Sequence, residues 1–139
     1  MKKLFAILIT IAATLMTASC QKDAPLVKDD LLGAWKLVSI DGDPVSTKSF
    51  SDSRGLSVWI QLSADSFDIY QRVGEDVSYS HFNGSWSLNE GVISGKYSDG
   101  SAWAGSYSVA LEGGYMTLSC ANEVQKFHKE PSLPSEILK

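Results

Sequence analysis

The chain has 139 residues, of which 44% are hydrophobic and 20% are charged, and its formal net charge is −4 at pH 7. This length fits one small domain built around a single core. The acidic balance and the absence of a basic run argue against a nucleic-acid partner.

The first nineteen residues have the pattern of a secretion signal. Two lysines, an uncharged apolar run over residues 4–16 and three small residues precede Cys20. This order is typical of a signal peptide, and the apolar run is too short for a permanent membrane span. Residues 1–19 are therefore predicted to be removed. Without the two lysines, ten basic side chains remain against sixteen acidic ones, a formal charge of −6.

Residues 15–20 resemble the lipobox of bacterial lipoproteins, although Thr17 stands where the lipobox usually has leucine. The resemblance implies that Cys20 is acylated and anchors the chain to a lipid bilayer, because two or more acyl chains anchor stably. Residues 21–23 partly resemble the surface-export signal of Bacteroidota lipoproteins. Together these features imply an outer-membrane lipoprotein of the cell envelope, on its periplasmic or its outer face. The alternative is an ordinary cleaved signal that leaves Cys20 as a thiol.

After a predicted tether, short β-type runs alternate with turn signals throughout the chain. The polar segment 45–55 is expected to be a loop. Asp99-Gly100 favours a type I′ hairpin turn. The predicted strands cover residues 31–40, 56–62, 66–73, 77–88, 92–98, 101–111, 115–120 and 124–129.

The strands show the period-two alternation of one buried and one outer face. Leu56, Val58, Ile60 and Leu62 share a face, as do Phe67, Ile69 and Val73 in the next strand, and Val77, Tyr79 and His81 in the one after it. Trp103, Gly105, Tyr107, Val109 and Leu111 share a face of the run 101–111.

The pattern predicts an all-β fold, a single antiparallel up-and-down barrel of about eight strands. No helix is long enough for a parallel crossover, and consecutive antiparallel strands remove their edges by closing on themselves. Residues 20–30 would be the lipidated cysteine and tether, 31–129 the barrel and 130–139 a flexible C-terminal tail. Eight strands enclose an interior that side chains fill or that holds one small ligand.

Gly33-Ala34-Trp35 resembles the opening motif of the calycins, and residues 38–42 resemble the lipocalin-like domain of Bacteroidota lipoproteins. A second Gly-x-Trp at 84–86 and the closing residues 126–129 extend the resemblance. It implies a lipocalin-like barrel. Trp35 can plug one end of it, and Gly33 allows close backbone approach there. Lipocalins place an arginine of the last strand over this tryptophan, a position that only Lys126 or Lys129 could take here.

Residues 95–99 and 103–107 also resemble strands of the biotin-binding avidins. Those barrels bind the ureido group of biotin through Ser, Tyr and Asn side chains. The polar residues of this chain do not match that set at a readable spacing, so biotin binding is not expected.

Inward-facing positions give a candidate ligand-binding set of one aliphatic and five aromatic or histidine residues. An amphipathic ligand would place its apolar tail against three of these residues and its polar head near the other three. A bend at Gly84 could invert the face that carries His81, and the same aromatic residues serve equally well as barrel packing. The candidate residues are Ile60, Phe67 and Trp103 for the tail, and Tyr79, His81 and Tyr107 for the head.

The sequence holds no catalytic or metal-binding motif of known spacing. Neither a catalytic residue, a metal site nor a cofactor is expected, and the chain is predicted not to be an enzyme. With Cys20 acylated, Cys120 has no disulfide partner, and a lone cysteine in a strand is usually a small buried apolar residue.

The sequence therefore favours a membrane-anchored, non-catalytic barrel that binds a small apolar or amphipathic ligand. The alternative is a structural or protein-interaction lipoprotein, an inhibitor or a subunit of an envelope complex, with a filled barrel. The sequence names no protein partner. A cavity inside the barrel would separate the two hypotheses.

Overall fold

The computed structural model describes residues 25–45, 56–74 and 78–138. The signal-peptide prediction for residues 1–19 and the lipidation of Cys20 lie outside these residues. One 3-10 helical turn, η1 (Lys28–Leu31), precedes the strands. The strands are β1 (Gly33–Ile40), β2 (Asp43–Pro44), β3 (Leu56–Leu62), β4 (Ser66–Val73), β5 (Ser80–Asn89), β6 (Val92–Tyr97), β7 (Tyr107–Glu112), β8 (Tyr115–Cys120) and β9 (Glu123–Glu130).

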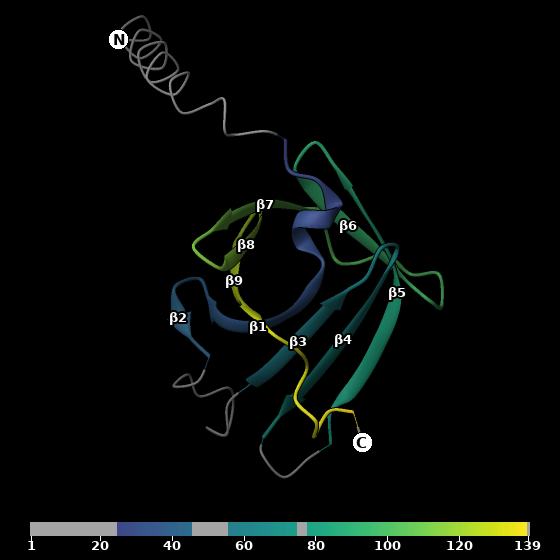
Figure 1. The fold of residues 1–139 in the computed structure, drawn as a ribbon, viewed down its shortest axis with the longest axis vertical. Helices are drawn as coiled ribbons and strands as arrows, with labels where there is room; N and C mark the ends of the chain where they lie inside the picture. The colour runs from purple at the N-terminus through teal and green to yellow at the C-terminus, as the bar shows by residue number, and fades with distance from the viewer. Residues whose placement is uncertain (1–24, 46–55, 75–77, 139) are drawn as a thin grey trace, which may run out of the picture.

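The strands form one antiparallel sheet that closes on itself (Figure 1). Each strand from β3 to β9 pairs with its neighbour in sequence, and β1 pairs with both β3 and β9. The short β2 only pairs with the last residues of β1. The prediction of an all-β, up-and-down barrel of about eight strands is confirmed, and residues 56–62, 66–73 and 115–120 match their strands residue for residue.

The two ends of the barrel differ in their connections. At the end where β1 begins, called the closed end here, β3–β4, β5–β6 and β7–β8 are joined through residues 63–65, 90–91 and 113–114. Glu90 and Gly91 both have positive φ, as do Gly113 and Gly114, the geometry of tight I′-type hairpins. The other end, called the open end, carries the longer links over residues 41–55, 74–79 and 98–106.

Trp35 fills the interior at the closed end. Its side chain is buried, and its Nε1 donates a hydrogen bond to the Leu31 carbonyl over 2.9 Å. Lys129 places its Nζ 4.8 Å from the centre of the indole ring and donates to the Leu32 carbonyl over 2.6 Å. Of the two lysines that the lipocalin resemblance allowed above this ring, the structure selects Lys129.

Gly33 has a positive φ of 121° and lies beneath the Lys129 side chain. A Cβ at this position would sit 2.8 Å from both Cε and Nζ of Lys129. The backbone conformation therefore favours glycine at this position, whereas the flexible end of Lys129 could move aside for a Cβ.

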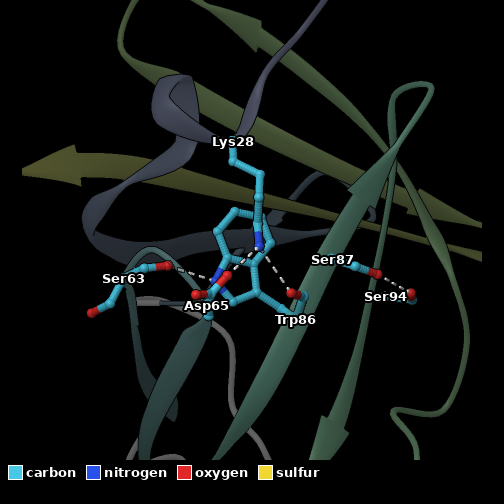
Figure 2. Close-up of polar contacts among 6 residues, drawn as sticks. All are labelled: Lys28, Ser63, Asp65, Trp86, Ser87 and Ser94. Atoms are coloured by element: carbon cyan, nitrogen blue, oxygen red, sulfur yellow. Dashed lines mark hydrogen bonds and ion pairs between the residues drawn. The ribbon is translucent and has the colours of Figure 1, made fainter.

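The second Gly-x-Trp repeats this arrangement on β5 (Figure 2). Trp86 is buried, and its Nε1 donates to the Ser63 carbonyl over 2.7 Å. Lys28 of η1 lies 4.4 Å from the ring centre, donates to the Trp86 carbonyl over 3.2 Å and pairs with Asp65 at 3.4 Å. A Cβ at Gly84 would lie 2.0 Å from the carbonyl oxygen of the adjacent strand, so the close approach needs glycine here.

These contacts change the boundaries of the segments beside the barrel. Residues 28–30, predicted as part of the tether, lie in η1 and are fixed to the closed end through Lys28 and through the fully buried Leu31. At the other terminus, Glu130 still belongs to β9, and residues 134–138 form a hydrogen-bonded turn.

The hairpin at Asp99-Gly100 differs from the expected I′ turn. The amide of Gly100 bonds back to the Tyr97 carbonyl, so Ser98 and Asp99 are the central residues, and of the turn residues only Gly100 has positive φ. The strand expected over 101–111 begins at Tyr107. The register shifts between the bridge Lys96–Ala102 and the pair Ile93–Tyr107, because four residues lie between these positions on one strand and two on the other.

Trp35→Ala should lower the free energy of unfolding by about 3–5 kcal/mol, because it empties a buried indole site. Trp35→Phe should lower the free energy of unfolding by less, because it keeps an aromatic ring in the site. Some loss should remain, because the hydrogen bond to the Leu31 carbonyl is removed. Urea unfolding of residues 21–139 measures both. A loss below about 1 kcal/mol for Trp35→Ala would show that the ring does not support the closed end.

Candidate functional site

A cavity of about 390 Å³ lies inside the barrel toward the open end, and we call it the inner cavity. This volume falls within the range of roughly 300–1,000 Å³ that is typical of small-molecule sites. Seven of the strands contribute to its wall. The lining residues are Leu37, Ile40, Leu56, Val58, Ile60, Ile69, Gln71, Tyr97, Trp103, Ala104, Tyr107, Leu118, Gln125 and Phe127.

The wall of the inner cavity is mostly apolar and carries four uncharged polar side chains. These are two amides, Gln71 and Gln125, and two phenols, Tyr97 and Tyr107. Among the described lining residues none is charged. An apolar wall with a few polar groups that can orient a ligand is the usual construction of a small-molecule site.

Trp103 forms one side of this cavity, and the shape of β6 makes room for it. A Cβ on Gly95 would lie 2.2 Å from Cε2 of the indole, so only glycine lets the ring lie flat against the strand. The Trp103 Nε1 donor is buried and has no hydrogen-bond partner in the described part of the protein. Such a donor costs about 1–3 kcal/mol, so Trp103 is the least satisfied side chain at the cavity.

Tyr107 provides a neutral hydroxyl at the same wall. Burial raises the pKa of its phenol, and the nearby Glu123, Cys120 and Tyr97 raise it further. Because the pKa moves upward from its usual alkaline value, the group stays protonated at neutral pH. It can therefore both donate and accept a hydrogen bond without bringing charge into the cavity.

Four of the six candidate ligand residues come together in the barrel. Ile60, Trp103 and Tyr107 line the inner cavity. Phe67 is fully buried and packs edge-on against Trp103, with ring centres 5.1 Å apart. The alternation predicted for residues 103–111 holds in the structure, although the first residues of that run lie outside β7.

The expected inward orientation of Tyr79 and His81 is corrected by the register of β5. His81 pairs with Tyr70 of β4, stacks on its ring at 4.5 Å and bonds to Asp68 through Nε2 at 2.8 Å. Its ring therefore lies against the outer face of β4, and His81 lines only the second hollow described below. Tyr79 bonds to Ser57, which alternates with the cavity residues Leu56 and Val58 and so faces outward.

Phe82 takes the inward position on β5 instead, directly opposite Ile69. The sequence held a signal for this assignment. Phe82, Gly84 and Trp86 are alternate residues and therefore share one face of the strand, and Trp86 belongs to the second Gly-x-Trp motif, which resembles the one expected inside the barrel. The prediction followed the parity of Val77 and Tyr79, which precede the strand.

A second hollow of about 490 Å³, called the outer chamber here, adjoins the inner cavity. Both are lined by Ile69, Gln71 and Tyr97, so the two spaces share a wall. Sequence reasoning did not single out Gln71, Tyr97 or Gln125. The remaining residues of the outer chamber are His81, Phe82, Asn83, Ser98, Asp99 and Ser101.

Within the described ranges, no group of three or more His, Cys, Asp or Glu side chains could hold a metal ion. Cys120 is partly exposed and unpaired, with Gly105 close beside its sulfur. None of the helical segments that the structure describes is long and apolar enough to cross a membrane.

The family model of the lipocalin-like domain matches residues 31–118. Because this match covers more than half of the chain, the protein belongs to the lipocalin-like domain family. Among curated proteins, none matches the sequence.

Two solved structures are similar to this chain. A lipocalin-like protein from Bacteroides uniformis is 19% identical, with a TM-score of 0.53, and the match covers 73% of this chain and 99% of that one. An uncharacterized protein from Bacteroides eggerthii is 18% identical, also with a TM-score of 0.53, over 71% of this chain and 98% of that one. At these identities the likeness shows the fold alone.

If the inner cavity is open, a larger side chain should affect the free energy of unfolding differently at a position in the cavity wall and at one in the filled core. Val58→Phe should change the free energy of unfolding by less than about 1 kcal/mol, because its ring has open space to enter. Ile93→Phe should cost about 1–3 kcal/mol, because Ile93 is only 1% exposed in the filled core. Urea unfolding of both variants provides the comparison. An equal cost at both positions would contradict an open cavity.

Proposed function

We propose that the protein is a membrane-anchored lipoprotein whose barrel binds a small apolar or amphipathic ligand in the inner cavity. The single observation that carries this proposal is the cavity of about 390 Å³ inside the barrel, with its apolar wall and four uncharged polar groups. Ile60, Trp103 and Tyr107 would be the main contacts. The buried N–H of Trp103 would gain a partner if the ring turns toward an acceptor atom of the ligand.

The proposed anchor would attach the barrel to the bilayer from its closed end. Cys20 and Lys28 are eight residues apart, a distance of at most about 29 Å even when fully extended. Lys28 is held at the closed end by Trp86 and Asp65. An acylated Cys20 would therefore hold the closed end within about 29 Å of the membrane, whereas the inner cavity lies toward the other end of the barrel.

The alternative of a protein-interaction lipoprotein assumed a filled barrel. The inner cavity argues against that premise, although it leaves open a partner at the outer surface. Binding by the isolated domain separates the two functions, because an interaction protein needs no ligand inside the barrel.

Nile red, a neutral apolar dye, should bind residues 21–139 saturably and change the tryptophan emission. Tyr107→Ala should weaken this binding by about tenfold, equivalent to about 1.4 kcal/mol. Tyr79→Ala is the matched control, since it removes the same side chain from the outer face and should leave the affinity unchanged. Titration by fluorescence measures both. Equal loss in the two variants, or no saturable binding, would refute ligand binding in the inner cavity.

Cys20→Ala in the full chain should abolish membrane association, because the acyl chains provide the proposed anchor. Fractionation of expressing cells followed by a high-salt wash tests this. The unchanged protein should remain with the membranes and the variant should appear in the soluble fraction. Retention of Cys20→Ala on washed membranes would contradict the lipid anchor.

A further inference from the structure

We propose that the ligand is an amphiphile with an uncharged, hydroxyl-bearing head group, which occupies the outer chamber while the tail fills the inner cavity. This inference rests on the proposed ligand-binding function and adds the chemical class of the ligand. Of the six candidate residues, only His81 lines this part of the open end.

The two spaces are placed to bind one molecule. Ile69, Gln71 and Tyr97 belong to the walls of both. A ligand that extends past these three residues would contact the apolar wall of the inner cavity at one end and the more polar wall of the outer chamber at the other. The shared wall itself changes character, from the aliphatic Ile69 to the amide of Gln71 and the phenol of Tyr97.

The outer chamber is rich in uncharged groups that donate and accept hydrogen bonds. The amide of Gln71 and three hydroxyls, those of Tyr97, Ser98 and Ser101, belong to residues of its lining. Amides and hydroxyls each serve as donor and acceptor, which is the combination that ligand hydroxyl groups need. Hydroxyl groups on a ligand head could therefore pair in several orientations.

The charge distribution disfavours an anionic head. Among the described lining residues of both spaces, there is no lysine or arginine. Asp99 is the carboxylate of the outer chamber, and its Oδ1 accepts hydrogen bonds from Ser101 N at 2.9 Å and Ser101 Oγ at 2.6 Å. These bonds lower the pKa of Asp99, so the group is negative at neutral pH and cannot pair with a carboxylate or phosphate.

A cationic head group would gain little binding energy from Asp99. Asp99 is a single carboxylate exposed to solvent, and one of its oxygens is already bonded to Ser101. Charge pairs in such surroundings are screened by water and salt. The uncharged polar groups of the outer chamber outnumber this carboxylate and form the larger part of the polar wall.

Phe82 supplies an apolar face within the polar chamber. It is 43% exposed and lies edge-on to Tyr97, with ring centres 6.3 Å apart. An exposed aromatic ring beside amides and hydroxyls suits a head group that has both C–H and O–H surfaces, such as a ring carrying several hydroxyls.

The test compares four probes that share an octyl tail: octyl glucoside, octanol, octanoate and octyltrimethylammonium. Each is titrated into residues 21–139 below its micelle concentration, with heat release and tryptophan emission as readouts. Octyl glucoside should bind at least about tenfold more tightly than any of the other three. Tighter binding of octanoate or octyltrimethylammonium, or equal binding of octanol, would overturn the head-group proposal while leaving the ligand-binding function intact. No binding of any probe, together with no binding of Nile red, would refute both.

Two variants locate the head. Phe82→Ala should reduce the preference for octyl glucoside over octanol by about fivefold or more, whereas Val92→Ala, a similarly exposed apolar residue at the closed end, should not. An unaltered glucoside preference in Phe82→Ala would place the head elsewhere and contradict the proposal.

Discussion

The pairing of β1 with both β3 and β9 is the constraint on which the structure depends. It removes both edges of the sheet, so every alternating position becomes either an inside or an outside position. Once the ring is closed, the parity of each strand decides whether a side chain can reach a ligand. Tyr107 and Tyr79 show the consequence, since the same residue type lines the cavity in one case and contacts Ser57 on the outer face in the other.

A closed barrel has two ends, and the side chains pack differently at each. At the closed end, Trp35 and Trp86 use the same device: a buried indole donates to a backbone carbonyl and a lysine covers the ring. Glycine two residues earlier permits the close packing in both. Both indoles fill the interior at the closed end, whereas the inner cavity lies toward the open end.

The weak point of the ring lies between β6 and β7, which pair directly only at Val92–Ser108 and Ile93–Tyr107. The second strand has two extra residues between these pairs and the bridge Lys96–Ala102, and Trp103 covers Gly95 beside this irregularity. The indole therefore belongs to the cavity and has a buried N–H without a partner in the described residues. The backbone amide of Trp103 donates to the Gly95 carbonyl over 2.9 Å, so the main chain is held at β6 and only the indole N–H lacks a partner in the described residues.

The sequence by itself determined the class of fold, because period-two alternation and turn residues are local signals that survive in any context. It also identified Ile60, Trp103 and Tyr107 as inward positions, since each lies in a run whose parity is unambiguous. It could not determine the face of β5, because the residues before Ser80 do not belong to the strand and a one-residue change of parity exchanges inside for outside. Only the closed ring decided that Phe82 replaces His81 inside, that Lys129 covers Trp35, and that space remains at the open end, since each depends on residues brought together from distant parts of the chain.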